Sequence, residues 1–595
     1  MARNQREAPP VTTAQRLGSI VKSVRDIMRR DKGLNGDADR LPMLTWILFL
    51  KFLDDLDYLN EETRETYEPI LSAPYRWRDW AAEPTGITGT ILLAFLNDQT
   101  ALHADGTEGM GLFAYLRSLK GNADPRRQVV GNVFANLQNR MQDGYLLREV
   151  VNKVNGIHFY STEEVHVLGN LYESLLKEMR DSAGDAGEFY TPRPVVKFMV
   201  WATNPKLGEH VHDPACGTGG FLVESFLHLK EQARTVEEQV VLQQSVSGVE
   251  AKGLPYLLAQ MNLLLHGMES PQIFAENSLR PVSYLGVNLD GIGEAQRVDV
   301  ILANPPFGGE EDPSVQKEFD EDLRTSETAL LFLQLIMRRL KRRGTSLGRA
   351  AIVVPNGTLF ALGVAARIKE KLLTEFNLHT IVRLPNGVFA PYTSIPANLL
   401  FFDTSGPTGT TWYYEHPLPE GRKNYSKTQP LQFEEFADLQ AWWSERVESD
   451  RAWKVEFGEI YDAAKEKADP LREIIRTADA AIMGRANHIA QVDKEIKEAE
   501  SGSLFAASGN VKELREERRE LVAERQKWEA KRTAAKEAFD ALWWPLFNLD
   551  LKNPVAQEEA AHVPPEQLVA EIIAGEKRIL EIMTEIESAL VGGIK

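Results

Sequence analysis

The residues of this sequence whose types and order could do chemistry lie in two loops, and the first reads "ILANPPFGG" (residues 301–309). The segment "VDVILA" that leads into it is apolar and β-branched, which predicts a buried strand. Because proline cannot donate to a sheet ladder, Pro305 and Pro306 end that strand and leave Asn304 extended at its carboxyl end. Ligands bind at such strand ends in open α/β sheets. The loop therefore predicts a ligand site built from an amide, two prolines and an aromatic ring.

The second loop, "DPACGTGGFL", runs from Asp213 to Leu222 between a short apolar strand and a helical stretch. Its glycines would let a ligand approach backbone amides at the start of a helix, or they would simply make a tight turn. A dinucleotide fingerprint would need another glycine three residues after Gly219, where this sequence has Leu222. The loop therefore disfavours a nicotinamide cofactor and favours another nucleoside-bearing one.

Two further polar residues follow short apolar segments. "SVSGVEAK" places Glu250 at the carboxyl end of a predicted strand, where a carboxylate can accept hydrogen bonds from both ribose hydroxyls. The simpler interpretation is an exposed loop glutamate, since Glu is usually exposed. In "FAENSLR", Asn277 lies where the edge of an adenine could be read. Both residues are candidates for binding a nucleoside.

The composition limits the classes of protein to which the chain can belong. Its 595 residues suffice for several domains, and 43% hydrophobic with 26% charged residues is ordinary for a globular protein. The single cysteine, Cys216, excludes a disulfide framework and a cysteine-rich zinc site. The apolar run at residues 43–53 is too short to span a bilayer and lies in the wrong place for a signal peptide. We therefore expect a cytoplasmic protein without membrane contact.

The hydrophobic pattern divides the chain into three regions. Residues 1–155 show helical spacing without strand alternation, which predicts an all-helical N-terminal domain. Residues 156–475 alternate short strands with helical stretches, which predicts a mostly parallel, doubly wound α/β sheet. Its expected strands lie in "HVHDPA", "SVSGVE", "VDVILANPP", "RAAIVVPNG", "HTIVRLP" and "NLLFFD". Residues 476–595 are rich in Ala, Glu, Lys and Arg, which predicts a helical, coiled-coil-like tail for subunit assembly.

Within this tail, apolar residues recur every seven positions, which predicts an antiparallel helical hairpin. The two stripes are Ile482, Ile489, Ile496 and Leu514, Leu521, Trp528, with "SGSLFAASGN" (residues 501–510) between them. A last amphipathic segment carries Leu568, Ile572, Ile579, Met583, Ile586 and Leu590. The stripes can pack on each other, but the third segment adds more apolar face than one hairpin buries, which favours a partner. We expect removal of the tail after residue 475 to leave a folded protein.

The order of the motifs resembles that of amino-group DNA methyltransferases: a glycine loop, an acidic strand end, an asparagine loop, then Asn-Pro-Pro-Phe. "GEFYTPRPVV" (residues 187–196) resembles the segment by which M subunits of type I restriction-modification systems touch the methionine part of S-adenosylmethionine. The likeness covers most of residues 10–460. It implies a class I, Rossmann-like S-adenosylmethionine-dependent methyltransferase with cofactor contacts at Glu188, Phe189, Tyr190, Thr191, Pro192, Arg193, Asp213, Cys216, Gly217, Thr218, Gly219, Gly220, Glu250 and Asn277.

The implied reaction is methylation of adenine N6, with Asn304, Pro305, Pro306 and Phe307 as the catalytic motif. The exocyclic amine is a poor nucleophile because its lone pair is delocalised into the ring. The Asn304 oxygen and the Pro305 carbonyl could each accept one N–H and favour the charge that develops in the transition state. Phe307 would stack on a base that has left the duplex. The methyl donor is activated as a sulfonium, so no metal is implied.

Other target bases fit the sequence less well. Methylation of cytosine C5 needs a thiolate, and the only cysteine, Cys216, lies inside the glycine loop. Enzymes that methylate cytosine N4 usually begin the motif with serine, whereas Asn-Pro-Pro-Phe accompanies adenine N6 in the family. The resemblance therefore implies an adenine-specific DNA methyltransferase.

The resemblance also implies partners: a DNA-specificity (S) subunit, a second M subunit, double-stranded DNA and, optionally, a restriction/translocase (R) subunit. The net charge of -18 argues against a chain that holds nucleic acid unaided, which fits a sequence-reading role delegated to a partner. Two alternatives stay open. One is a protein-glutamine methyltransferase, whose amide target poses the same electronic problem. The other is a scaffold that binds S-adenosylmethionine without reacting.

Overall fold

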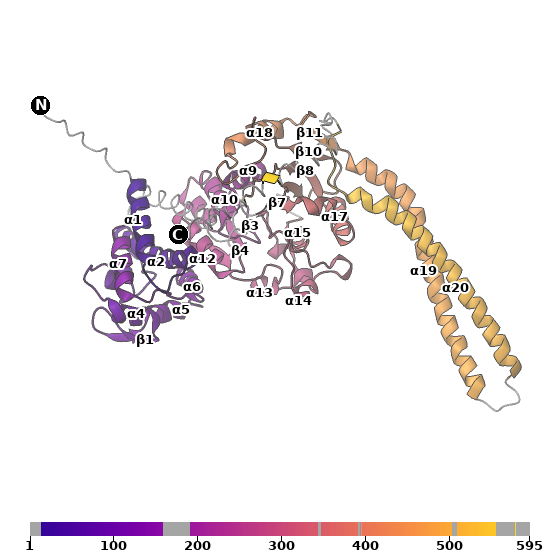
Figure 1. Cartoon of the computed structure of the whole chain (residues 1–595), viewed down its shortest axis with the longest axis horizontal. Helices are drawn as coiled ribbons and strands as arrows, with labels where there is room; N and C mark the ends of the chain where they lie inside the picture. The colour runs from indigo at the N-terminus through magenta and orange to yellow at the C-terminus, as the bar shows by residue number, and fades with distance from the viewer. Residues whose placement is uncertain are drawn as a thin grey trace. The chain divides into compact units, whose positions relative to one another are not determined.

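In a computed structural model the chain divides into two units, Met1–Lys552 and Asn553–Lys595. Figure 1 shows the helices and strands that the structure describes. The structure describes residues 13–158, 191–342, 347–390, 393, 395–501, 508–554, 577, 578 and 583. Most of the last amphipathic segment expected from the sequence, including Leu568, Ile572, Ile579, Ile586 and Leu590, lies outside the described residues. Met583 is described and is 62% exposed.

The N-terminal region is helical, as the spacing of its apolar residues predicts. Its core is rich in large aromatic side chains, among them Trp46, Trp77 and Phe113, all nearly inaccessible to solvent. The carboxylate of Asp31 ties distant segments together, because it accepts hydrogen bonds from the backbone N–H groups of Gly33 and Gln142. The helices are α1 (Thr13–Met28), α2 (Asp37–Thr63), α3 (Trp77–Trp80), α4 (Gly89–Asn97), α5 (Leu112–Ser118), α6 (Pro125–Phe134) and α7 (Gly144–Asn155).

One element departs from the all-helical expectation. Strands β1 (Thr100–Leu102) and β2 (Glu108–Met110) form a two-stranded antiparallel sheet. Three-residue strands are too short to produce a readable alternation, so only their turn signals them. That turn contains Gly106 at φ 84°, in the left-handed region that favours glycine.

The second region is built on a nine-stranded mixed sheet in the order β11-β10-β8-β9-β7-β6-β3-β4-β5. The five strands from β7 to β5 run parallel, and β9 is inserted antiparallel between β7 and β8. The strands are β3 (Val211–Asp213), β4 (Val246–Val249), β5 (Gln272–Phe274), β6 (Val300–Ala303), β7 (Arg349–Pro355), β8 (Asn377–Arg383), β9 (Ala397–Asp403), β10 (Thr411–Glu415) and β11 (Ala452–Val455). All six expected strands are present, whereas β5, β10 and β11 were not expected.

Alternate residues of the central strands enter two different cores, which is the reason the sheet is covered on both faces. On β6, Val300 and Leu302 lie in one hydrophobic cluster, and Ile301 and Ala303 lie in the other. The helices of this region are α9 (Arg193–Thr203), α10 (Gly220–Lys230), α11 (Val236–Leu242), α12 (Gly253–Leu265), α13 (Val282–Leu285), α14 (Pro313–Gln316), α15 (Thr328–Arg339), α16 (Asn356–Phe360), α17 (Val364–Glu375) and α18 (Ala437–Ser444).

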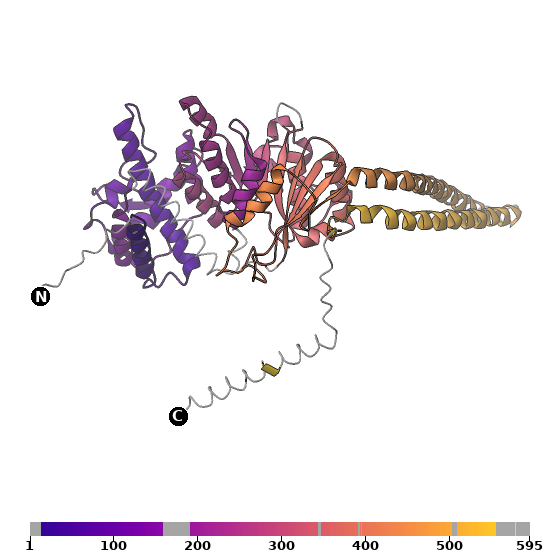
Figure 2. The same ribbon diagram turned by 90° about the horizontal axis from the view of Figure 1, so that it is seen from above.

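The expected helical hairpin is present as α19 (Phe457–Ser501) and α20 (Ser508–Trp543), which lie side by side (Figure 2). Ile489 and Ile496 of the first stripe are buried in the seam, and the Leu514, Leu521 and Trp528 stripe is half-buried. Ion pairs such as Arg485 with Glu524 join the two helices at their surface. The two stripes therefore pack mainly on each other, which is the simpler of the two expected arrangements.

The base of the hairpin belongs to the core of the sheet region. Helix α19 begins at Phe457, before the expected boundary at residue 475. After α20 the chain forms the short helix η6 (Trp544–Phe547), and Trp543, Phe547 and Leu549 are buried against the sheet. Truncation after residue 475 would therefore remove part of this core, contrary to the expectation of a separable tail. No helix in the described ranges is long and apolar enough to cross a membrane.

Candidate functional site

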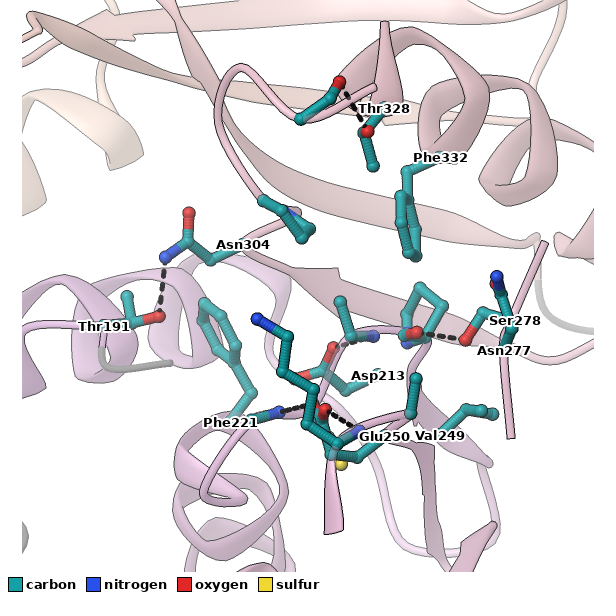
Figure 3. Close-up of a pocket in the computed structure, with 18 of the residues that line it drawn as sticks. Thr191, Asp213, Phe221, Val249, Glu250, Asn277, Ser278, Asn304, Thr328 and Phe332 are labelled. Carbon is teal, nitrogen blue, oxygen red and sulfur yellow. Dashed lines mark hydrogen bonds between the residues drawn. The ribbon is translucent and has the colours of Figure 1, made fainter. Parts of the chain in front are cut away.

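A cavity of about 280 Å³ lies where the carboxyl ends of β3, β4, β5 and β6 meet (Figure 3). Because parallel strands end at the same edge of a sheet, the loops that follow them converge there. Its wall includes Thr191, Arg193, Asp213, Cys216, Gly217, Thr218, Gly220, Glu250, Asn277, Asn304 and Pro306. The structure thus brings together most of the residues that the sequence singled out from five separate segments.

The remaining predicted residues lie elsewhere. Pro192, Gly219, Pro305 and Phe307 do not line the cavity, although each is adjacent in sequence to a residue that does. Glu188, Phe189 and Tyr190 lie outside the described residues, so their predicted contacts with the cofactor stay predictions.

The glycine loop makes a tight turn from β3 into α10. Gly217 and Gly219 have φ values of 53° and 79°, in the left-handed region that L side chains rarely adopt. A side chain at Gly219 would also crowd Ala259 of α12, at 3.3 Å between β-carbons. The side-chain amide of Asn262, on α12, donates to the carbonyl of Thr218 at 3.0 Å and holds the loop in place. The glycines therefore serve both the turn and the close packing of α12.

Glu250 connects the end of β4 to this glycine loop. Its carboxylate accepts hydrogen bonds from the backbone N–H of Gly217 at 3.0 Å and from that of Lys252 at 2.7 Å. Burial raises the pKa of Glu250, while the two hydrogen bonds oppose that rise. The side chain is only 8% exposed, which excludes the interpretation as a solvated loop glutamate.

Asp213 is a second buried carboxyl at the cavity wall, at the end of β3. It accepts a hydrogen bond from the backbone N–H of Ala215 at 2.9 Å. Burial, with a smaller contribution from the neighbouring charge of Glu250, raises the pKa of Asp213 to about 8, although the hydrogen bond from Ala215 opposes the rise. With this raised pKa the carboxyl is mostly protonated at neutral pH.

Cys216 is buried in the glycine loop and lines the cavity. Burial raises the pKa of its thiol well above the usual value, so the sulfur stays protonated. A buried, protonated thiol is a poor nucleophile, in keeping with the argument against cytosine C5 chemistry.

Asn304 lies at the carboxyl end of β6, and only the nitrogen of its side-chain amide forms a hydrogen bond within the described structure. Its Nδ2 donates to the Thr191 hydroxyl at 3.0 Å, which fixes the orientation of the side chain (Figure 3). Its Oδ1 is buried and accepts no hydrogen bond from any residue that the structure describes. A buried acceptor left without a donor is costly, so the site is organised for a ligand that donates an N–H or O–H at this point.

The rest of the loop after β6 is held by residues that sequence reasoning missed. The carbonyl of Gly309 accepts hydrogen bonds from the backbone N–H of Thr328 at 3.1 Å and from its hydroxyl at 2.7 Å. Thr328 begins α15, which also places Phe332 in the cavity wall. Thr328 follows a loop in sequence, and no motif marks it, so its role depends on tertiary structure.

Phe307 packs on another aromatic residue instead of lining the cavity. Its ring meets Phe389 edge to face, with 5.9 Å between ring centroids. The side chain is half-buried, so part of the ring faces outward beside the loop. This arrangement holds the ring in place and leaves an accessible part for stacking.

The asparagine loop after β5 is ordered by its own hydrogen bonds. The Oδ1 atom of Asn277 accepts from the backbone N–H of Leu279 at 2.9 Å, and the hydroxyl of Ser278 donates to the carbonyl of Pro214. Lys252 and Ser278 complete this side of the cavity, and both were missed from the sequence.

No group of three or more His, Cys, Asp or Glu side chains within the described residues is placed to hold a metal ion.

Comparison with known proteins agrees with this geometry. A sequence model of the N-6 DNA Methylase family matches residues 163–471, which is more than half of the chain. The chain belongs to this family. The N-6 DNA methylase family comprises adenine-specific DNA methyltransferases, so the predicted class of enzyme is confirmed. The Rossmann-like α/β methyltransferase fold is confirmed as well.

Its relatives include methylase and modification subunits of type I restriction enzymes. The chain is 47% identical to the type I restriction enzyme EcoEI methylase subunit of Escherichia coli over 75% of its own length and 88% of that protein. A modification subunit of a putative type I restriction enzyme from Vibrio vulnificus YJ016 is 61% identical, with a TM-score of 0.70 over 76% of this chain and 94% of that chain. A chain from a study of complex assembly in the type I R-M system is 33% identical, with a TM-score of 0.65, and covers 98% of this chain.

Proposed function

We propose that this N-6 DNA methylase is the modification subunit of a type I restriction-modification complex. It transfers a methyl group from S-adenosylmethionine to N6 of an adenine in a specific DNA sequence, which a separate DNA-specificity subunit reads. The observation that carries this proposal is the buried, unpartnered Oδ1 of Asn304 at the edge of the cavity. An adenine amine supplies the N–H that this oxygen lacks.

The residues of the cavity fit the proposed cofactor. Glu250 is fixed at a strand end, where a carboxylate can accept from ribose hydroxyls. Buried Asp213 offers a carboxyl that a cationic ligand would favour in its ionised form. The glycine turn at Gly217 brings backbone close to the ligand without a β-carbon. When bound, S-adenosylmethionine supplies a methyl group already activated for transfer.

The residues at the end of β6 act on the base. The oxygen of Asn304, oriented by its bond to Thr191, accepts one N–H of the adenine amine. The carbonyl of Pro305 accepts the other, so the lone pair is localised on nitrogen as positive charge develops there. These two acceptors matter more in the transition state than in the ground state, which is the condition for an effect on rate.

The target adenine must leave the helix before it can reach these acceptors, because an enzyme cannot act on the amine inside a stacked duplex. The partly exposed ring of Phe307, supported by Phe389, is the surface on which the extruded base stacks. Stacking of a base on an aromatic ring contributes roughly 1–3 kcal/mol, which offsets part of the cost of extrusion.

A partner subunit recognises the DNA sequence. The chain has a formal net charge of -18, which opposes unaided binding to phosphates. We infer that the long hairpin of α19 and α20 docks a DNA-specificity subunit, beside a second copy of this chain, on double-stranded DNA. A restriction/translocase subunit joins this assembly when it acts as a nuclease.

The test uses the full chain purified together with the DNA-specificity subunit from its own genomic neighbourhood. Transfer of a tritiated methyl group to duplex DNA, followed by digestion to nucleosides, should label N6-methyladenine. The Asn304→Ala complex should label DNA about 100-fold more slowly or not at all, while it still binds S-adenosylmethionine. Label in protein glutamine instead of DNA would favour a glutamine methyltransferase, and cofactor binding without any transfer would favour a non-catalytic scaffold.

A further inference from the structure

A buried lysine on α17 is used by no part of the proposed mechanism. Lys369 is only 1% exposed, and its ammonium donates to the carbonyls of Leu359 and Ala361 at 2.6 and 2.8 Å. These carbonyls lie at the end of α16, the short helix that follows β7. Because the last carbonyls of a helix lack partners within it, the ammonium satisfies acceptors that would otherwise be buried unpaired.

Lys369 lies on α17, which packs against α15, the helix whose first residue, Thr328, anchors the loop after β6. The charge of Lys369 attracts Glu327, and this attraction opposes the rise that burial causes in the pKa of that carboxyl. Glu327 pairs with Glu310 through a short antiparallel bridge and precedes Thr328, whose two hydrogen bonds hold Gly309. Lys369 therefore stabilises the segment that fixes the loop beginning at Asn304.

The next residue on α17 holds the base of the hairpin. Glu370 accepts a hydrogen bond from the indole N–H of Trp543 at 3.0 Å, and Arg472 lies 3.8 Å from the same carboxylate. The guanidinium of Arg472 in turn lies over the Trp543 ring at 4.1 Å. One residue from each helix of the hairpin is therefore fixed to a single side chain of α17.

Lys369 and the base of the hairpin donate hydrogen bonds to the same backbone carbonyl. Leu359, which accepts from Lys369, also accepts from the backbone N–H of Leu549 at 2.9 Å. Leu549 follows η6 at the base of the hairpin and is buried in the same core. The hairpin base is therefore joined to Lys369 by hydrogen bonds to the carbonyl of Leu359, and Lys369 acts on Glu327 through its charge.

We propose that Lys369 is a positioning residue for methyl transfer, which couples the base of the hairpin to the loop that carries Asn304. This inference rests on the proposed function, in which the hairpin docks the DNA-specificity subunit. Docking of that subunit then favours the arrangement of the catalytic loop that transfers the methyl group. Such coupling requires an element whose arrangement both sites bias, and α17 is the element that both sides contact.

The test is a double-mutant cycle in the full complex, with cofactor binding and transfer measured separately. Lys369→Met keeps the length of the side chain and removes the ammonium, while Trp543→Phe removes the N–H that Glu370 accepts. Each should lower kcat, by about tenfold for Lys369→Met and about threefold for Trp543→Phe, with the S-adenosylmethionine Kd unchanged within twofold. The double variant should lose little more than Lys369→Met alone, because both changes break one link.

Lys371→Met provides the matched control, since it removes a partly exposed lysine from the same helix. It should leave kcat unchanged. Combined with Trp543→Phe, it should therefore give the same kcat as Trp543→Phe alone. Assays run well below the melting temperature of the least stable variant separate positioning from unfolding. If Lys369→Met does not fold, Glu327→Gln tests the same link from the other side.

Two results would overturn the inference. One is a multiplicative loss of kcat in the double variant, and the other is a normal kcat in Lys369→Met with only a lowered melting temperature. The wild-type complex distinguishes this failure from failure of the proposed function. If the wild type itself does not methylate DNA, the proposed function is wrong, and if it does, the cycle judges the coupling alone.

Discussion

The carboxylate of Glu250 accepts the backbone N–H of Gly217 at 3.0 Å, so the acidic end of one strand and the glycine turn after its neighbour form one rigid wall of the cavity. This contact joins residues from two loops that are far apart in sequence. It fixes the carboxylate before any ligand arrives, which reduces the entropic cost of binding.

Replacement of this carboxylate should weaken the cofactor. Glu250→Ala is expected to reduce the affinity for S-adenosylmethionine by roughly 1.5 to 3 kcal/mol, the range for hydrogen bonds to a charged group. Glu250→Gln should have a smaller effect because an acceptor oxygen remains for Gly217 or the ribose. Titration calorimetry measures both, and an unchanged Kd in the alanine variant would remove Glu250 from the cofactor site.

Removal of the amide at the end of β6 should separate binding from catalysis. Asn304→Ala is expected to lower kcat by about 100-fold or more, the order found when one preorganised polar group is removed from a transition-state site. The Kd for S-adenosylmethionine should stay within about twofold, because the amide acts on the base. Thr191→Val, which removes only the hydroxyl that orients Asn304, should cause a smaller loss of kcat with the same Kd. Normal transfer by Asn304→Ala would contradict the assigned role.

The pKa of Asp213 predicts proton release when the cofactor binds. In the folded protein burial raises this pKa from 3.8 to about 8, so between about pH 4 and pH 8 the native carboxyl holds a proton that the unfolded chain has lost. The contribution of this carboxyl to stability therefore falls as pH rises through that window. A cationic ligand favours the ionised form, so binding should strengthen as pH rises from 6 to 8.

Calorimetry at pH 7 in buffers of different ionisation enthalpy measures this proton directly. The wild type should release a fraction of a proton on binding S-adenosylmethionine, and Asp213→Asn should release none from this position. Equal proton release by the two proteins would show that Asp213 does not respond to the ligand.

The hairpin can be shortened but not cut at its base. Truncation after residue 475 removes buried Trp543, Phe547 and Leu549, and loss of a large core side chain costs roughly 3–5 kcal/mol. Such a chain should not fold stably, since whole domains are stable by only about 5–15 kcal/mol. Replacement of residues 480–531 by a short Gly/Ser turn keeps this base, because Asp479 and Arg532 already face each other as an ion pair.

The shortened protein should melt cooperatively and bind S-adenosylmethionine with a normal Kd. It should fail to co-purify with the DNA-specificity subunit and fail to methylate its site. Full-stoichiometry assembly of the shortened protein would move the docking surface away from the hairpin.

The thiol of Cys216 should be dispensable for methyl transfer. Its burial and its raised pKa leave no thiolate for attack on a base. Cys216→Ala is therefore expected to retain transfer to adenine, with a small loss of thermal stability from the missing sulfur. Abolished transfer with normal S-adenosylmethionine binding would require a chemical role for this residue.

The local order of residues was enough to predict the strands that carry the site and the loops that follow them. The proline pair after β6, the glycine turn after β3 and Glu250 after β4 are signals within single segments, because they depend on backbone rules for proline and glycine and on strand length. The seven-residue spacing of Ile482, Ile489 and Ile496 likewise predicts the hairpin, because it needs only helix geometry.

Direction and pairing in the sheet could not be predicted in the same way. The segment "NLLFFD" reads as a buried strand in either direction, and only the completed sheet shows that β9 runs antiparallel between β7 and β8. Strands β5 and β11 lie at the edges of the sheet, where burial imposes little pattern, and β10 lies next to the edge strand β11.

The sequence by itself determined the protein family and the residues that could bind a nucleoside or act on an amine. Both depend on residue type and on local spacing. Only the tertiary structure decided that Thr191 orients Asn304, that Thr328 anchors Gly309, and that Trp543 returns to the core. These contacts join residues separated by many positions, and their formation depends on the packing of the whole chain. A long-range contact leaves no period or motif in the sequence, since it is selected by complementary shape and hydrogen bonding in the folded state.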